Sequence, residues 1–390
     1  MTQDPKMVGS APVTRHVEIC GAGFAGLTAA IALARRGWSV RVHEKGRDLR
    51  EQGAGIVLWN NTLRILDEFG LTEEINRGSM RPPFYETRMQ NKIVSDEHIP
   101  GIPWCTMTRT LLHSVLSDAA RREGVEIVTG SEVVSANESG TIRLAAGTEL
   151  KADLVIGADG VGSTVRESLG IHFERHQARD GITRFLVTRR KEDLQKIEPH
   201  TEWDNVIDFW NLEPRVLRVL YVPANDRELY IALMAPADDQ EGSAVPKIDL
   251  DVWTSIHPQL TPVLEEAAKI DGKYFRYQTN RLDRWTRGRV ALIGDAAHAM
   301  APALAQGGGC AMMNAYTIAE AASASATADL PDALVEWERV ERPFTDRCQT
   351  RSQGFADTRG MSQGGQFVGD NNETALYDPT DPRRHDVAAA

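Results

Sequence analysis

The segment HVEICGAGFAGLTAAIALARRGWSVRVHEKG, residues 16–46, decides the fold. Residues 16–20 predict a short buried strand, and residues 27–36 predict an alanine-rich helix that ends at Gly37. Residues 39–43 predict the next strand. The first strand and the helix are joined by G-x-G-x-x-G, so the segment predicts a Rossmann-like strand–helix–strand unit that binds a dinucleotide.

Each glycine of this motif has a separate physical role. The first permits a tight turn, the second lets a pyrophosphate approach the backbone, and the third lets the helix pack close to the strand. An acid 23 residues after Gly21, Glu44, would accept hydrogen bonds from a ribose, which favours FAD or NAD over a 2′-phosphate. The predicted cofactor contacts here are Gly21, Gly23, Phe24, Ala25, Gly26, Glu44 and Lys45.

Two further glycine turns follow apolar strands. In DLVIGADGVGSTVR, residues 153–166, the turn is either an ordinary strand-to-helix connection or a source of backbone donors beside a phosphate, and the residues leave both open. In ALIGDAAHAMAPALAQGGGC, residues 291–310, Asp295 could hold a ribityl hydroxyl. The glycines at 307–309 could present backbone N–H groups to an electron-rich ring edge.

Composition limits the classes of partner. The 390 residues include 44 Lys and Arg against 55 Asp and Glu, a net charge of −11, which argues against nucleic acid and anionic membrane surfaces as partners. The four cysteines show no metal spacing, so no metal site is expected. No run resembles a signal peptide or a membrane span, and a cytoplasmic protein is expected.

In order and spacing, the three glycine motifs resemble those of the single-component FAD-dependent aromatic monooxygenases. The resemblance implies an α/β fold, with a Rossmann-like FAD-binding domain of the aromatic hydroxylase type and an inserted, mostly antiparallel β-sheet domain for the substrate. It implies bound FAD, NADH or NADPH as electron donor, O2 as co-substrate, and oxygen transfer through a flavin C4a-hydroperoxide. Further cofactor contacts implied by the resemblance are Arg50, Arg109, Asp159, Gly160, Asp295, Pro302, Gly307, Gly308 and Gly309.

The pattern changes between the second and third motifs. Segments such as GITRFLVTRR and ELYIALMAP alternate with a period of two, which predicts strands that form a roof over the flavin. We expect residues 15–80, 100–170 and 285–358 to form the FAD-binding domain, and residues 81–99 and 171–284 to form the substrate domain. Residues 359–390 are expected to be an irregular C-terminal tail.

Two arginines lie within these strands, flanked by apolar residues on their own faces. Arg184 shares a face with Ile182 and Leu186, and Arg218 lies likewise in RVLRVLYVP. A half-buried guanidinium is costly unless a negative group pairs with it. The partner is either an internal acid such as Asp208 or a substrate carboxylate, and the residues leave both open.

The resemblance extends to a branch of the family that oxygenates hydroxypyridine carboxylates and opens their ring. It implies substrate-pocket residues at Tyr85, Arg184, Arg218, Tyr230, Tyr277 and Pro302. One position departs, because Val57 stands where that branch has a tyrosine. His298, in the third motif, is more simply explained by burial than by catalysis.

Three alternatives remain beside the expected hydroxylation of a small, hydroxylated N-heteroaromatic (pyridine) carboxylate. A hydroxylase of a hydroxybenzoate or phenol would leave the ring intact. A flavin halogenase would carry W-x-W-x-I-P, which none of the eight tryptophans matches. A flavin-binding redox protein without chemistry of its own would have little use for the mid-strand arginines. A homo-oligomer is left open.

Overall fold

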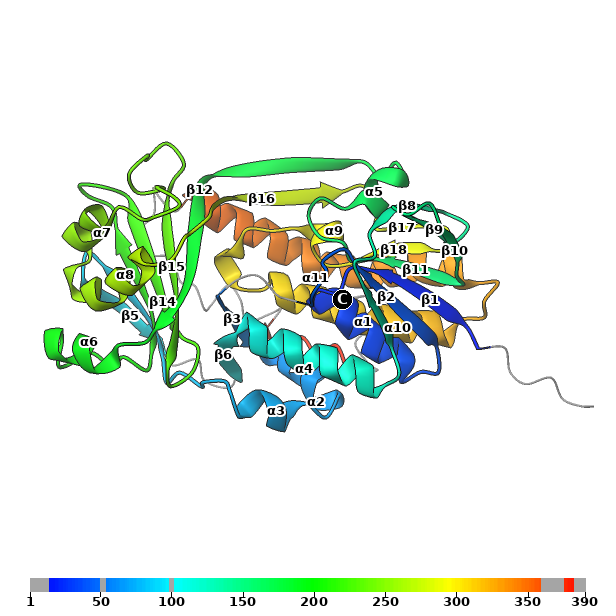
Figure 1. Ribbon diagram of the computed structural model, residues 1–390, viewed down its shortest axis with the longest axis horizontal. Helices are drawn as coiled ribbons and strands as arrows, with labels where there is room; N and C mark the ends of the chain where they lie inside the picture. Colours follow the sequence, from blue (N-terminus) through cyan, green and yellow to red (C-terminus); the bar gives the residue numbers. More distant parts are fainter. Residues whose placement is uncertain (1–13, 50–53, 98–101, 359–374, 382–390) are drawn as a thin grey trace, which may run out of the picture.

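The computed structural model describes residues 14–49, 54–97, 102–358 and 375–381. Figure 1 shows two parts side by side, one around a mainly parallel sheet and one around an antiparallel sheet, with the long helix α11 (Leu330–Thr358) passing between them. This arrangement confirms the expected α/β fold of the aromatic hydroxylase type. None of the helices in the described ranges is long and apolar enough to cross a membrane.

The first part is a six-stranded sheet in the order β17-β18-β11-β1-β2-β7. Its strands from β18 to β7 are parallel, and only β17 is antiparallel. The strand order reverses beside β1, so the carboxyl ends of β1, β2 and β11 meet where ligands bind in such sheets. The strands are β1 (His16–Cys20), β2 (Ser39–Glu44), β7 (Glu126–Thr129), β11 (Leu154–Gly157), β17 (Thr286–Arg287) and β18 (Val290–Leu292).

Helices cover this sheet. The helix α1 is buried along nearly its whole length because its small residues let α10 and α4 approach closely. The helices of this part besides α11 are α1 (Phe24–Ala34), α2 (Asn60–Glu68), α3 (Thr72–Asn76), α4 (Arg109–Arg122), α5 (Thr164–Ser168), α9 (Asp295–His298), the 3₁₀ turn η2 (Pro302–Leu304) and α10 (Gly307–Ala324). A small sheet of β8 (Val133–Asn137), β9 (Thr141–Leu144) and β10 (Glu149–Lys151) lies at the edge.

The second part is a seven-stranded sheet in the order β16-β12-β15-β14-β13-β4-β5. All neighbouring pairs are antiparallel except β13 and β4, which confirms the mostly antiparallel roof. The strands are β4 (Tyr85–Met89), β5 (Lys92–Glu97), β12 (Phe173–Thr188), β13 (Val206–Asn211), β14 (Leu217–Pro223), β15 (Glu228–Pro236) and β16 (Tyr274–Leu282). They fall within the two segments expected for the substrate domain, whose boundaries stay a prediction.

The two faces of this sheet have different partners. The outer face packs on α6 (Lys191–Ile197), α7 (Leu250–Ile256), the 3₁₀ turn η1 (Pro258–Leu260) and α8 (Thr261–Ala268). The inner face meets a two-stranded ribbon of β3 (Gly55–Trp59) and β6 (Trp104–Thr108). We call the buried side chains on this inner side the inner cluster: Ala54, Val57, Trp59, Tyr85, Ile102, Trp104, Ala178, Ile182, Val206, Val222, Tyr230, Ala232, Met234, Tyr277, Ala301, Ala356 and Ala375.

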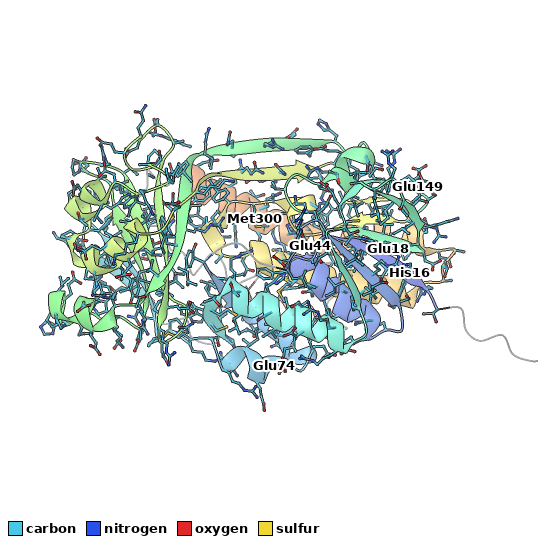
Figure 2. The ribbon with its side chains drawn as sticks, in the orientation of Figure 1. His16, Glu18, Glu44, Glu74, Glu149 and Met300 are labelled. Atoms are coloured by element: carbon cyan, nitrogen blue, oxygen red, sulfur yellow. The ribbon has the colours of Figure 1, made fainter. Side chains whose placement is uncertain are left out.

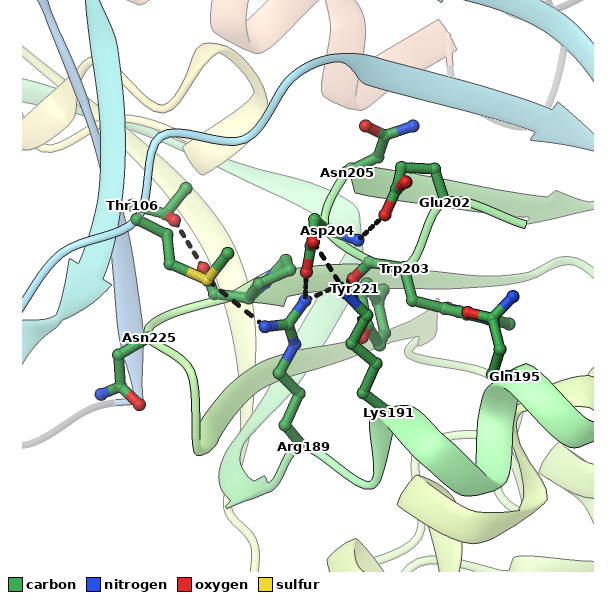
Figure 3. A network of polar contacts seen from close by, with 12 residues as sticks. Thr106, Arg189, Lys191, Gln195, Glu202, Trp203, Asp204, Asn205, Tyr221 and Asn225 are labelled. Atoms are coloured by element: carbon green, nitrogen blue, oxygen red, sulfur yellow. Dashed lines mark hydrogen bonds and ion pairs between the residues drawn. The ribbon is translucent and has the colours of Figure 1, made fainter. Parts of the chain in front are cut away.

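A polar network holds the end of β12 to the loop before β13 (Figure 3). The buried guanidinium of Arg189 donates to the carbonyl oxygen of Trp203 at 2.7 Å and pairs with Asp204, which also pairs with Lys191 at 2.7 Å. Beside it, the Thr106 hydroxyl of β6 donates to the carbonyl oxygen of Pro223 of β14. These contacts fix the ribbon against the antiparallel sheet, so the network has a structural role.

Candidate active site

In the first glycine motif, two of the three glycines have no room for a side chain, whereas the third, Gly23, has open space beside it. A Cβ atom at Gly21, where φ is +107°, would lie 2.3 Å from the carbonyl oxygen of Ala158, and one at Gly26 would lie 1.9 Å from that of Gly21. At Gly23, by contrast, an added Cβ would meet no heavy atom within 4 Å. The backbone before α1 is therefore bare and accessible where a pyrophosphate is predicted to approach the positive end of the helix dipole.

The backbone orients the carboxylate of Glu44 at the end of β2 (Figure 2). The Ala22 N–H donates to Oε2 at 3.1 Å and the Gly46 N–H donates to Oε1 at 2.8 Å. Glu44 lines a cavity of about 210 Å³, together with Gly21, Gly23, Lys45, Asp159 and Gly160. A pre-oriented acceptor beside a bare glycine turn fits the adenosine half of FAD.

Phe24 and Ala25 belong to the motif but, like Arg109, are not among the residues that line this cavity. The ring of Phe24 and the methyl of Ala25 are buried in the first turn of α1. The guanidinium of Arg109, the first residue of α4, lies 4.7 Å from the centre of the Phe24 ring. Their contacts with the cofactor stay predictions, and Arg50 lies outside the described residues.

Of the two alternatives that the sequence left open for the second motif, the strand-to-helix turn is present, and the role of its backbone donors beside a phosphate stays a prediction. The motif is a strand-to-helix turn, because Asp159 Oδ2 accepts from the backbone N–H of Val165 at 3.1 Å at the start of α5. The other oxygen, Oδ1, has no hydrogen-bond partner within the described ranges, although it is buried. Because an unpartnered buried acceptor is costly, this oxygen fits a hydroxyl donor from a bound cofactor.

Arg166 joins the second motif to the third. Its buried guanidinium donates to the carbonyl oxygens of Val161 and Ala296, both at 3.0 Å. In the third motif, Gly294 has a φ of +61° and turns the chain into α9, leaving Asp295 exposed at its start. In the view of Figure 2, Met300 of the following loop lies between the antiparallel sheet and Glu44. Pro302, the first residue of η2, is exposed, while its neighbours Ala301 and Ala303 are buried.

The three glycines that open α10 differ in surroundings. A Cβ at Gly309 would lie 2.6 Å from Gln306 Oε1 and 3.3 Å from Asn61 Nδ2, so the space beside Gly309 is already occupied by side chains of Gln306 and α2. At Gly307 and Gly308 the nearest side-chain atoms, of Met300 and Ile56, would lie at 3.6 and 3.2 Å. Contacts of all three glycines with the flavin stay predictions.

His298 is fully enclosed in the third motif. Its ring lies 5.4 Å from the ring of Trp285, and burial lowers its pKa to about 4. The side chain is therefore neutral near pH 7 and is suited to packing, in line with the interpretation from sequence.

The inner face of the antiparallel sheet brings together the predicted substrate residues. Tyr85, Tyr230 and Tyr277 all belong to the inner cluster. Arg218 stands opposite Met234, and Arg184 stands opposite Ala232, so both arginines share the face of that cluster. Close packing continues to the ribbon, because a Cβ at Gly55 of β3 would lie 2.5 Å from that of Tyr230.

Arg218 has an internal acidic partner. Its Nε and Nη2 donate to Asp208 Oδ1 and Oδ2 at 2.5 and 2.6 Å, and the Tyr85 hydroxyl donates to Oδ2 at 3.2 Å. Burial alone would lower the pKa of Arg218, but the Asp208 carboxylate outweighs burial and raises it. The sequence left either an internal acid or a substrate carboxylate as the partner of Arg218. The internal acid, Asp208, is present, and a contact of Arg218 with the substrate stays a prediction.

Arg184 differs from Arg218. It is half-buried, and no acidic side chain in the described part of the chain lies within ion-pair distance of it. Its guanidinium lies 5.6 Å from the centre of the Phe275 ring. Burial raises the pKa of the Tyr230 hydroxyl, and the nearby charge of Arg184 partly offsets that rise. A positive charge therefore lies beside the inner cluster without an acidic partner among the described residues.

Replacing Asp208 by asparagine is expected to destabilise the protein by about 3 kcal/mol, because it leaves the buried Arg218 without a counter-charge. Urea unfolding of the holoprotein measures the change. The matched control is Asp238→Asn, which breaks an exposed pair with Arg179 and should change the free energy of unfolding by about 0.5 kcal/mol or less. Equal effects of the two changes would contradict the structural role of the Arg218–Asp208 pair.

Several residues that line the cavity beside Glu44 were not predicted, among them His43 and Ser131. The His43 ring bonds the buried Glu18 at 2.8 Å and the Ser131 hydroxyl at 2.8 Å. His43 stands directly before Glu44, which was an available signal. Ser131 follows β7 with no local pattern, so only the sheet order brings it to the site.

The parallel sheet with three glycine turns, and the antiparallel sheet above it, define an FAD-binding flavoprotein. Residues 14–341 match the family described as FAD binding domain, and the chain belongs to that family. It is an FAD-dependent aromatic monooxygenase, for which NAD(P)H and O2 are the typical co-substrates, as the resemblance predicted.

Several proteins of known structure or sequence are similar to this chain over most of its length. The chain is 52% identical to 2-methyl-3-hydroxypyridine-5-carboxylic acid oxygenase in its tetrameric form, with a TM-score of 0.90 over 94% of this chain and 97% of that one. It is 38% identical to 2-heptyl-3-hydroxy-4(1H)-quinolone synthase of Mycobacteroides abscessus, over 86% of this chain and 88% of the relative. It is 27% identical to 6-hydroxynicotinate 3-monooxygenase of Bordetella bronchiseptica, over 77% and 80%.

Proposed function

We propose that the protein hydroxylates a hydroxylated pyridine carboxylate and opens its ring. The observation that carries this proposal is Arg184, a cation beside the inner cluster with no acidic partner among the described residues. A guanidinium binds a carboxylate through two parallel hydrogen bonds and so orients as well as attracts it. The 52% identity to an oxygenase named for such a substrate supports the same class.

The chain's own residues would position the ring rather than transfer protons. Arg184 holds the carboxylate, and the hydroxyl of Tyr230 or Tyr277 contacts the ring hydroxyl. FAD reduced by NAD(P)H supplies the oxygen transfer when bound. The inner cluster excludes water from the ring, which protects the oxygenation from side reactions.

The proposed reaction has two stages, hydroxylation of the ring and then addition of water. Substrate, O2, NAD(P)H and a proton give the hydroxylated ring, NAD(P)+ and water. Hydroxylation beside the ring nitrogen then lets a second water add across the carbon–nitrogen bond, and the ring opens. The product therefore gains one oxygen atom and the elements of water.

A second candidate substrate is a larger heteroaromatic ring, as in a 4-quinolone. The wall near β3 is apolar, since Val57 is buried and the rings of Trp59 and Trp104 stack at 5.8 Å. Relatives at 35–38% identity are named quinolone synthases. A hydroxybenzoate hydroxylated without ring opening is a third candidate, and it would use the same arginine.

Ligand titration followed by the flavin absorbance spectrum separates these candidates. A hydroxypyridine carboxylate should bind at least about tenfold more tightly than its carboxamide, because only the carboxylate pairs with Arg184. Equal binding of the acid and amide would contradict the proposed anchor. Binding of a 2-alkyl-4-quinolone alone would favour the second candidate.

Two further properties, the oligomeric state and the cellular location, belong to the proposal. We expect a homo-oligomer, supported by the tetrameric form of the relative at 52% identity, and light scattering on the purified protein tests it. The cytoplasmic location also stays a prediction.

A further inference from the structure

Near its end the chain returns to the middle of the molecule. We call residues 375–381 the C-terminal strap; in Figure 1 this segment, in red, lies near the centre of the view. Ala375 is fully buried and belongs to the inner cluster with Tyr85, Tyr230 and Tyr277. The strap therefore contributes a buried side chain to the cluster that contains the proposed substrate residues, although it lies far from them in sequence.

Two residues after Ala375, Tyr377 anchors the strap to α11. Its ring packs at 4.3 Å from the ring of Phe344, and its hydroxyl donates to Glu341 Oε1 at 3.3 Å. Tyr377 and Glu341 are both buried, at 8% and 1% exposure. Large rings buried in this way contribute much of the stability of a docked segment.

Asp378 anchors the strap to α2. One carboxylate oxygen accepts from the backbone N–H and the hydroxyl of Thr380, at 3.0 and 2.7 Å, and so closes a turn. The other oxygen pairs with Arg64 of α2 at 2.8 Å. Two adjacent residues of the strap therefore hold it to two different helices, α11 and α2.

Of the two anchoring helices, α11 contributes a side chain to the inner cluster, and α2 follows a strand that contributes side chains to it. The helix α2 follows directly on β3, which carries Val57 and Trp59, and α11 carries Ala356. The strap contacts both helices and adds Ala375 to the same cluster.

We propose that the C-terminal strap is part of the active-site wall and sets how completely water is excluded during oxygenation. This rests on the proposal that the inner cluster surrounds the substrate. Without the strap, NAD(P)H, O2 and a proton would more often be converted to NAD(P)+ and H2O2, with no oxygen transferred to the ring. Tyr377 is then a positioning residue that acts through Ala375 and the β3 ribbon.

The test compares Tyr377→Ala with Leu376→Ala, its neighbour in the strap, which is 48% exposed. The probe is 2-methyl-3-hydroxypyridine-5-carboxylate, and the readout is H2O2 formed per NADH oxidised by the holoenzyme. Tyr377→Ala should raise this ratio about fivefold or more, Tyr377→Phe by less, and Leu376→Ala should leave it unchanged. FAD content, measured by absorbance, should be the same in all variants.

Two truncated proteins and a second measurement, hydrogen exchange, test the proposal independently of turnover. Removal of residues 375–390 should act like Tyr377→Ala, whereas removal of 382–390 should not. Hydrogen exchange of the backbone at residues 55–59 should quicken only in the variants that lose the strap. Unchanged exchange in those variants would overturn the proposal even if the probe is not a substrate, and the absence of turnover by the parent protein would count against the proposed function alone.

Discussion

Replacing Gly23 by alanine is expected to weaken FAD binding at least about tenfold while leaving the stability of the apoprotein nearly unchanged. Gly23 has φ −76° and ψ −176°, which any residue can adopt, and an added Cβ meets nothing within 4 Å. The methyl group therefore costs the protein little. It does occupy the space through which the pyrophosphate must approach the backbone, so the loss falls on the cofactor. Reconstitution of apoprotein, followed by flavin fluorescence, measures the dissociation constant.

The control for Gly23 is Gly37→Ala at the other end of α1. Gly37 has a φ of +82°, and an added Cβ there also meets nothing within 4 Å. This change should destabilise the fold by about 1 kcal/mol through backbone strain and leave FAD affinity unchanged. If Gly23→Ala bound FAD as tightly as the parent protein, the bare turn before α1 would not be the pyrophosphate site.

Replacing Arg184 by methionine is expected to raise the dissociation constant of a hydroxypyridine carboxylate about 10- to 100-fold, with FAD occupancy unchanged. Methionine keeps much of the apolar stem and removes the charge, so the packing on the inner face is largely retained. The loss then reports the charge-assisted bonds to the carboxylate. Titration by flavin absorbance measures the ligand, and the ratio of flavin to protein absorbance measures the cofactor.

Substitutions of two other arginines serve as comparisons for Arg184→Met. Arg179→Met, on the same strand but exposed, should leave ligand affinity unchanged. Arg218→Met should lower the free energy of unfolding, because it leaves the buried Asp208 without its partner. If Arg184→Met kept full affinity and Arg218→Met lost it without loss of stability, Arg218 would be the anchor instead.

The sequence predicted most closely those parts of the fold that depend on local backbone constraints. The first strand was predicted at residues 16–20, as observed in β1, because apolar residues stop where the first glycine permits a turn. The helix was predicted from residue 27 but begins at Phe24. Gly23 is its N-cap, and Gly26 lies in its first turn. The alternation in β12 and β14 predicted that each arginine shares a face of its own strand with apolar residues, because side chains in a strand alternate with a period of two. That both arginines lie on one face of the sheet follows only from the observed register.

Long-range partners could not be predicted in the same way. Both Asp208 and a ligand carboxylate satisfy the charge of Arg218, and only the register of β13 on β14 decides between them for the free protein. The C-terminal residues are polar and rich in turn formers, so their pattern predicted an irregular tail. Nothing local indicates that Tyr377 would be buried against α11, because its partners lie more than thirty residues away in sequence.

The most direct test of the proposed function is turnover of a hydroxypyridine carboxylate by the purified FAD-loaded protein, with product mass and absorbance recorded together. We expect the ligand to stimulate NADH or NADPH oxidation, and the product to gain one oxygen atom and the elements of water while losing its aromatic absorbance. A product that gains a single oxygen atom and keeps the aromatic band, or stimulation by hydroxybenzoates alone, would contradict the ring-opening account.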